Sequence, residues 1–256
     1  MEDRIVRNVK FLVTLLFASA FLMNAYSANP PEIKYDEAWA IQLYKAGNFK
    51  RAFQLFEQAA MHGKVNAQYY LGRMYFNGEV EGEDVDYVKA FEWYQKAAVN
   101  GHAEAQACFG RMYFLGRGVP VNFDKAMEWY QKSAAQGNAF GQYGVACVYY
   151  RIQKDYPKAL EWYKKSAEQG DPNAQYSLAC MYYYGEGTDK NFEQAIKWFK
   201  CAAEQDIAAA QYDLGVIYLK GQGTVQSEST AKMWFKRAAA NNYNEAVEAL
   251  KKLSGN

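Results

Sequence analysis

Ser229 and Lys232 are the residues whose spacing most directly suggests a reaction. They stand in the order Ser-x-x-Lys, which in penicillin-recognising serine enzymes places a lysine one helical turn from a nucleophilic serine. The Ser-Asp-Asn and Lys-Thr-Gly motifs that accompany it in those enzymes are both absent from this sequence. Ser227 and Ser229 also stand where a helix is expected to begin, and serine is a preferred capping residue there. We therefore predict helix caps at these positions and no nucleophile.

Two histidines and three Gly-x-Gly sequences are the other residues of types found in metal or phosphate sites. His62 and His102 each adjoin a glycine, and neither has a second histidine or a clustered cysteine at ligand spacing. The Gly-x-Gly sequences that begin at Gly116, Gly185 and Gly221 follow helical patterns and lack the lysine of a phosphate-binding loop. We therefore predict no metal site and no cofactor.

Five tryptophans divide most of the chain into units of similar length. They are separated by 36, 33, 36 and 36 residues, at Trp93, Trp129, Trp162, Trp198 and Trp234. A second series, AQYYLGRMY and its counterparts, runs in step and places a small residue at Gly72, Gly110, Ala146, Ala179 and Gly215. Self-similarity at this period predicts a solenoid of stacked helical pairs.

Each unit contains two helical patterns joined by a turn. In the second one, apolar residues recur on one helix face, as at Ala90, Trp93, Tyr94 and Ala97. Capping residues that mark its start are Asp86, Asn122, Asp155 and Asn191. Residues that mark its end are Gly101, Gly137, Gly170, Asp206 and Asn242. We predict that the small residues lie where paired helices cross, and that the tryptophan rings form one continuous apolar core.

These two series resemble the Sel-1-like repeat family, a relative of the tetratricopeptide repeats. The family pattern A-x-x-Q-Y-x-L-G-x-M-Y-x-x-G-x-G, followed by D-x-x-K-A-x-x-W-Y-x-K-A-A-x-x-G, is matched nearly in full at 64–101 and 171–206. Ala146 and Ala179 replace the usual glycine, and the third unit lacks Gly-x-Gly around 151–154. The resemblance implies an all-α fold, specifically an α/α solenoid wound as a right-handed superhelix.

The resemblance also divides the chain. About five repeats are expected, at 64–101, 102–137, 138–170, 171–206 and 207–243. Residues 28–63 resemble a degenerate N-terminal helical hairpin, with Leu55 in the tryptophan position. Residues 244–256 are expected to form a C-terminal capping helix, because repeat arrays need a polar outer face at their ends.

Residues 1–27 have the pattern of a secretory signal peptide. Arg4, Arg7 and Lys10 precede an apolar run of 13 residues, and small residues around Ala25 suit cleavage after Ser27. The run is short for a membrane span, so we expect an exported protein, periplasmic or secreted by a bacterium, with an uncleaved membrane anchor as the alternative. The rest of the chain carries 26 basic and 26 acidic residues, a balance that does not favour a nucleic-acid partner.

Four cysteines follow the apolar run: Cys108, Cys147, Cys180 and Cys201. A secreted, cysteine-rich branch of the resembled family joins the two helices of each repeat by a disulfide. Here Cys147 and Cys180 occupy equivalent positions in successive repeats, and only the fourth repeat has two cysteines. We expect small packing residues, and a Cys180–Cys201 disulfide stays open as the alternative.

The first helix of each pair lines the concave side in related solenoids, which implies a binding surface here. On this helix Leu71, Gly72 and Tyr75 are expected to pack against the second helix, so the positions three before, one after and four after the small residue are expected to be exposed. The candidate partner-binding residues are Tyr69, Arg73, Phe76, Arg111, Phe114, Tyr143, Tyr150, Tyr176, Tyr183 and Tyr212. Tyrosine and arginine are frequent in interface hot spots, whereas aromatic rings at helical spacing also commonly belong to a core.

These observations favour an exported, non-enzymatic interaction scaffold that holds a partner protein or peptide in its concave groove. The alternative function is a weak β-lactamase-like or cell-wall-peptide hydrolase that uses Ser229 and Lys232. A membrane enters only if the N-terminal segment is not cleaved.

Overall fold

The computed structural model describes residues 36–82 and 84–255. All regular structure in these ranges is helical. The helices are α2 (Glu37–Lys45), α3 (Phe49–Met61), α4 (Val65–Asn77), α5 (Tyr87–Val99), α6 (Ala103–Leu115), α7 (Phe123–Ala135), α8 (Ala139–Val148), η1 (Tyr149–Gln153), α9 (Tyr156–Glu168), α10 (Pro172–Tyr184), α11 (Phe192–Glu204), α12 (Ala208–Lys220), α13 (Glu228–Ala240) and α14 (Asn244–Ser254). The signal peptide expected over 1–27 lies outside the described residues.

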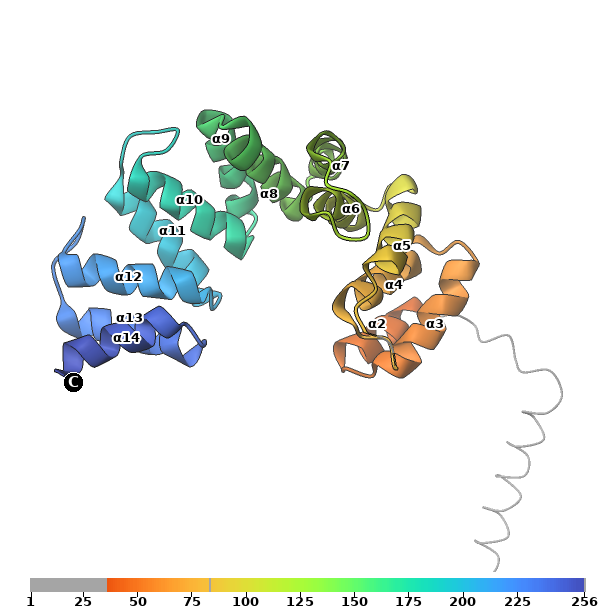
Figure 1. Ribbon diagram of the computed structural model, residues 1–256, viewed down its shortest axis with the longest axis horizontal. Helices are drawn as coiled ribbons and strands as arrows, with labels where there is room; N and C mark the ends of the chain where they lie inside the picture. The colour runs from red at the N-terminus through yellow and green to blue at the C-terminus, as the bar shows by residue number, and fades with distance from the viewer. Residues whose placement is uncertain (1–35, 83, 256) are drawn as a thin grey trace, which may run out of the picture.

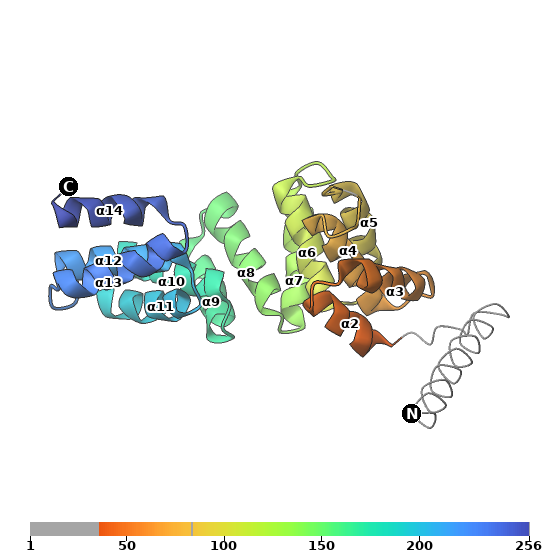
Figure 2. The same ribbon diagram turned by 90° about the horizontal axis from the view of Figure 1, so that it is seen from below.

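The helices stack in chain order into an arch (Figure 1). Each helix packs chiefly on the helices that precede and follow it. Helices α6 and α8 lie on the inner side of the arch, and α7 and α9 lie on its outer side. Figure 2 shows the same row from the open side, with α2 and α14 at opposite ends. The predicted all-α solenoid of helical repeats is therefore confirmed.

Small residues allow the two helices of a pair to approach closely. Gly72 of α4 faces Tyr94 of α5, and a Cβ atom at Gly72 would lie only 2.7 Å from Cδ1 of that ring. Gly215 of α12 faces Phe235 of α13 in the same way. The predicted crossing position is therefore correct, and the aromatic ring of the second helix fills the space that a side chain would otherwise occupy.

The rings at the centre of the core follow the tryptophans by one position. At most 3% of the surface is exposed in each of Tyr94, Tyr130, Tyr163, Phe199 and Phe235. All tryptophans of the series before Trp234 are only partly buried, so the prediction of a continuous tryptophan core is wrong. One position is a rotation of about 100° on a helix, enough to move a ring from the centre of the packed face to its edge. Lys165 Nζ lies over the Trp162 ring, 4.1 Å from its centroid.

The helix ends follow the sequence signals closely. Each predicted capping residue accepts a backbone N–H of the first turn: Asp86, Asn122, Asp155 and Asn191. Each predicted end residue has a positive φ: Gly101, Gly137, Gly170, Asp206 and Asn242. Ser227 caps α13 by accepting the Thr230 N–H at 3.2 Å. Ser229 lies inside the first turn of α13, so the cap predicted there is wrong.

The third repeat ends differently, as its missing Gly-x-Gly suggests. Helix α8 runs directly into the π-helix η1, which Lys154 ends with a φ of 57°. Tyr150 of η1 still reaches the next repeat, where its hydroxyl donates to Glu186 at 2.8 Å. The shorter connection therefore preserves the row of rings along the first helices.

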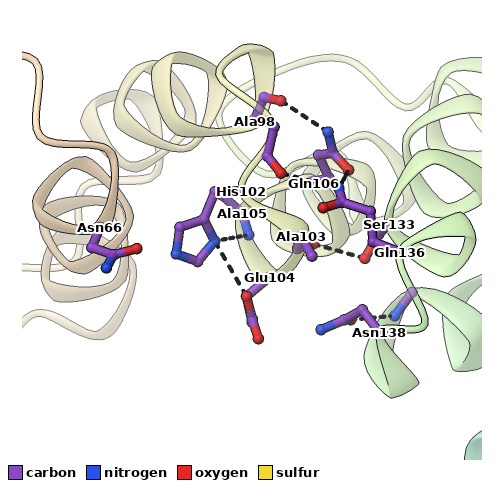
Figure 3. Close-up of polar contacts among 12 residues, drawn as sticks. Asn66, Ala98, His102, Ala103, Glu104, Ala105, Gln106, Ser133, Gln136 and Asn138 are labelled. Atoms are coloured by element: carbon purple, nitrogen blue, oxygen red, sulfur yellow. Dashed lines mark hydrogen bonds and ion pairs between the residues drawn. The ribbon is translucent and has the colours of Figure 1, made fainter.

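Side-chain amides join the start of the first helix to the end of the second within a repeat, and they also bond to the preceding repeat (Figure 3). Gln106 of α6, which is 6% exposed, donates to the Ala98 carbonyl of the preceding repeat at 3.1 Å and accepts from Gln136 at 2.8 Å. The same donor–acceptor pairing recurs from Gln169 to Gln142, from Gln205 to Gln175 and from Asn241 to Gln211. We call these four pairs the amide ladder. The repeat pattern of the sequence does not predict these bonds.

Candidate functional site

The predicted partner-binding residues lie on the first helices of the repeats and on η1. Their eight aromatic members are all partly buried, as is Arg111, whereas Arg73 is exposed. Each of four rings contacts the buried ring of the following helix, with centroids 6.1 Å apart for Tyr69–Tyr94, 5.7 Å for Tyr143–Tyr163, 5.8 Å for Tyr176–Phe199 and 5.5 Å for Tyr212–Phe235. These rings therefore contribute to the core and keep only part of their surface accessible.

Four of the predicted residues meet at one hollow of about 340 Å³ between α4 and α6. The Arg111 guanidinium carbon lies 5.3 Å from the centroid of the Phe76 ring and 5.9 Å from that of Phe140. We call this site the arginine hollow. Its lining residues are Tyr69, Arg73, Phe76, Asn77, Tyr94, Cys108, Arg111 and Phe140. The structure thus brings the two predicted arginines to the same place.

Aromatic rings hold the arginines of this hollow. The Arg73 guanidinium carbon lies 5.3 Å from the centroid of the Tyr44 ring. Among the described residues, no carboxylate forms an ion pair with Arg73 or Arg111. Burial raises the pKa of Tyr69 to about 12, so its hydroxyl is neutral at physiological pH. The hollow therefore presents two positive groups whose N–H donors have no acidic partner in the described chain.

Further along the row, tyrosine hydroxyls connect successive repeats. Each donates to a side chain of the next repeat: Tyr150 to Glu186 at 2.8 Å, Tyr176 to Asp213 at 3.1 Å and Tyr183 to Gln222 at 2.7 Å. The remaining predicted ring, Phe114, packs edge-on against Phe123 with centroids 5.5 Å apart. These contacts hold the accessible edges of the rings in defined positions.

Asp213 of α12 is a site residue that sequence analysis missed. Burial raises its pKa to about 6, an effect that the hydrogen bond from Tyr176 partly opposes. It lies two positions before the small residue, where the other repeats carry Tyr70, Cys108, Gly144 and Ser177. A comparison of this position across the five repeats would have identified Asp213, because only the fifth repeat carries an acidic residue there.

Ser229 and Lys232 do not form a serine–lysine pair. Lys232 Nζ lies 2.6 Å from Glu228 Oε1, in an ion pair along the exposed side of α13. The Ser229 hydroxyl, which is exposed, lies 3.1 Å from that of Ser227. The lysine is therefore occupied by a carboxylate, and the geometry gives the serine no base.

The histidines take structural roles. His102 accepts the Ala105 N–H at 3.2 Å and so caps α6 (Figure 3), while its ring stacks on Tyr69 with centroids 4.6 Å apart. Burial lowers the pKa of His102. His62 Nδ1 donates to the Gln58 carbonyl at 2.8 Å. In the part of the chain that the structure describes, no three His, Cys, Asp or Glu side chains gather as metal ligands would.

All four cysteines are free thiols, including the Cys180–Cys201 pair considered for a disulfide. Burial raises the pKa of Cys108 to about 11 and that of Cys180 to about 12, and it also raises the pKa of Cys147. These thiols are therefore protonated at neutral pH, whereas a reactive cysteine needs the thiolate. Their surroundings suit packing residues.

The Sel1 repeat family model matches the sequence at residues 40–64, 65–102, 103–138, 139–171, 172–207 and 208–243. Comparison with curated protein sequences found no match. Among the described residues, no helix combines the length and the apolar character needed to cross a membrane.

Solved structures resemble the fold over most of the chain. The Sel1 repeat protein from Oxalobacter formigenes superposes with a TM-score of 0.75 at 29% identity, covering 85% of this chain and 89% of that one. The protective antigen c5321 of uropathogenic Escherichia coli, which has an SLR fold, gives 0.50 at 30% identity, covering 80% and 52%. Immunity protein Pa5087 from Pseudomonas aeruginosa gives 0.58 at 20% identity, covering 83% and 84%, a likeness of fold alone.

Proposed function

Because this chain belongs to the Sel1 repeat family, whose members are in general protein–protein interaction scaffolds, we propose that it binds a partner protein on the concave side of its arch. The observation that carries the proposal is the arginine hollow. Arg73 and Arg111 line the same cavity of about 340 Å³, and aromatic rings hold their guanidinium groups where no described acid neutralises them.

The chemistry of the arginine hollow favours an acidic segment of the partner. A guanidinium group is a planar fork of N–H donors that matches a carboxylate, and such charge-assisted bonds are the strong ones. Rings already order both side chains, so less conformational entropy is lost when a carboxylate binds. We therefore place the main contact of the partner at Arg73 and Arg111, with the accessible ring edges farther along the row as secondary contacts.

Two further parts of the proposal concern export and catalysis. We propose that residues 1–27 direct export and are removed, which the intact mass of the exported chain tests. We propose that the protein is not an enzyme, which is supported by the pairing of Lys232 with Glu228. Nitrocefin turnover that is abolished by Ser229→Ala would contradict this second part.

The central test is capture of the partner from an extract of the native compartment. The wild type is compared with the double variant Arg73→Glu, Arg111→Glu, which reverses the charge of the hollow. The matched control is Lys96→Glu, Lys165→Glu, which makes the same change of net charge at exposed lysines of second helices. We expect proteins that the wild type and the control both capture to be lost with the arginine variant. Equal capture by all three chains would contradict the proposed surface.

A further inference from the structure

A second hollow lies between α10 and α12, near the C-terminal end of the arch. It has a volume of about 210 Å³, and its lining includes Tyr183, Tyr184, Tyr212 and Asp213. Tyr184 is 61% exposed, which leaves its ring accessible at the rim. We call this site the acidic hollow. It places one carboxylate among three tyrosine rings.

The Asp213 carboxylate has no positive partner in the described residues. It accepts a hydrogen bond from the Tyr176 hydroxyl at 3.1 Å, and no lysine or arginine of the described chain forms an ion pair with it. Lys220 lines the same hollow but lies outside ion-pair distance of the carboxylate. A partly buried carboxylate without a counter-ion is costly, and this cost favours binding of a cation from outside.

Few charged groups on the neighbouring helices could pair with the Asp213 carboxylate. The titratable groups that act on or beside Asp213 are Tyr176, Cys180 and Tyr184 on α10, Lys220 on α12 and Tyr243 before α14. Burial raises the pKa of Tyr184 and that of Tyr243, and raises the pKa of Cys180 to about 12, so these three groups are neutral at physiological pH. The charges at and near the hollow are therefore those of Asp213 and of Glu186, which also acts on Tyr184, and the lysine at the rim opposes them.

We propose that the acidic hollow receives an arginine side chain of the partner protein, with Asp213 as the ion-pair acceptor and the tyrosine rings as stacking surfaces. A guanidinium group stacks on aromatic faces and at the same time donates two N–H bonds to a carboxylate. It is also more weakly hydrated than an ammonium group, which favours arginine over lysine at a partly buried acid. This inference rests on the proposed function and adds a second chemical requirement to the partner.

The two hollows together define the polarity of the partner segment. The arginine hollow lies between α4 and α6, and the acidic hollow lies three repeats farther along the row. A partner that spans the groove then presents acidic residues toward the N-terminal end of the arch and an arginine toward the C-terminal end. Such an arrangement fixes the direction in which the segment binds.

The test uses the full chain, labelled with ¹⁵N, and follows backbone amide shifts by NMR during titration. The probe is N-acetyl-arginine-N-methylamide, and its uncharged control is the citrulline analogue of the same shape. We expect shifts at the amides of 183–184 and 212–216 with the arginine probe and none with citrulline. Asp213→Asn should weaken binding at least tenfold, while Lys220→Ala should strengthen it a few-fold by removing the like charge at the rim. At pH 5 the wild type should bind about tenfold more weakly than at pH 7.5, because Asp213 has a pKa of about 6 and is then mostly protonated.

Several results would overturn the inference. Equal shifts with citrulline, or unchanged binding to Asp213→Asn, would show that no ion pair forms. Equal affinity for the corresponding lysine probe would overturn the assignment to arginine. Circular dichroism shows whether Asp213→Asn folds. If it does not, the comparison with citrulline and the binding to Lys220→Ala still test whether the ion pair forms. If the arginine probe fails while partner capture still depends on Arg73 and Arg111, this inference falls and the proposed function stands.

Discussion

Replacing Gln106 with leucine removes one rung of the amide ladder and keeps a buried side chain of similar length. The substitution deletes the bond to the Ala98 carbonyl at 3.1 Å and the bond from Gln136 at 2.8 Å. Neither partner is left without a bond, because the Ala98 carbonyl still accepts the Gly101 N–H and Gln136 still donates to the Gly101 carbonyl. The cost is therefore two net hydrogen bonds at roughly 1 kcal/mol each, about 2 kcal/mol of unfolding free energy.

Gln68 provides the matched control, at the same position of the first repeat and with the same 6% exposure. It makes one long bond to the Ala60 carbonyl at 3.4 Å, and its Oε1 atom accepts no hydrogen bond among the described residues. The equivalent of Gln136 in this repeat is Asn100, which donates to the Lys96 carbonyl instead. Gln68→Leu removes a buried acceptor that lacks a donor, so we expect a change of less than about 1 kcal/mol, in either direction.

The two variants are compared by thermal unfolding, followed by far-ultraviolet circular dichroism. For a chain of this size, 1 kcal/mol corresponds to a shift in Tm of about 2–4 °C. We expect Gln106→Leu to lower the Tm by about 4–8 °C and Gln68→Leu to leave it within about 4 °C of the wild type. Equal losses for both variants would refute the reasoning, because packing volume alone would then explain them.

Three further substitutions test other features of the fold. Because burial raises the pKa of Asp213 to about 6, the wild type should lose stability as pH rises from about 4 through 6. The variant Asp213→Asn lacks this loss. In urea unfolding it should be more stable than the wild type by about 2 kcal/mol at pH 8 and equally stable near pH 4. Gly72→Ala should lower the unfolding free energy by about 1–2 kcal/mol, because its Cβ would meet Tyr94 at 2.7 Å. The matched variant Gly110→Ala, with its nearest contact at 3.0 Å, should lower it less. The reverse order would count against the crossing geometry. Tyr163→Ala should cost about 3–5 kcal/mol, more than Trp162→Ala, because Tyr163 is 3% exposed and Trp162 is partly buried; a larger loss for the tryptophan would restore it to the centre of the core.

The repeat pattern was sufficient to predict the helices, their caps and the crossing residues. Those features depend on neighbours in the chain or on a spacing that recurs, such as Asp86 before α5 and Gly72 opposite α5. The tryptophan core was predicted incorrectly because a large ring suggests burial, while the choice between Trp162 and Tyr163 depends on the rotation of the helix within the stack. A rotation of that kind is set by tertiary packing, which the sequence of one helix does not reveal.

The candidate site was predicted in part. Arg73 and Arg111 were selected from their positions on the first helices, and the structure places them at one hollow. The rings of the row were harder to assign, because each takes part both in the core and in the surface, as Tyr69 does. Asp213 was missed because its surroundings depend on a helix of the preceding repeat, α10, whose Tyr176 donates a hydrogen bond to it.

The amide ladder has a consequence for how such a chain grows during evolution. Each rung lies within one repeat, and Gln106, Gln175 and Gln211 also donate to an alanine carbonyl of the preceding repeat, so an in-frame duplication of one such module would reproduce both kinds of hydrogen bond without any compensating substitution. Gene duplication can therefore lengthen the protein one repeat at a time. Selection then needs to alter only the side chains that contact a ligand.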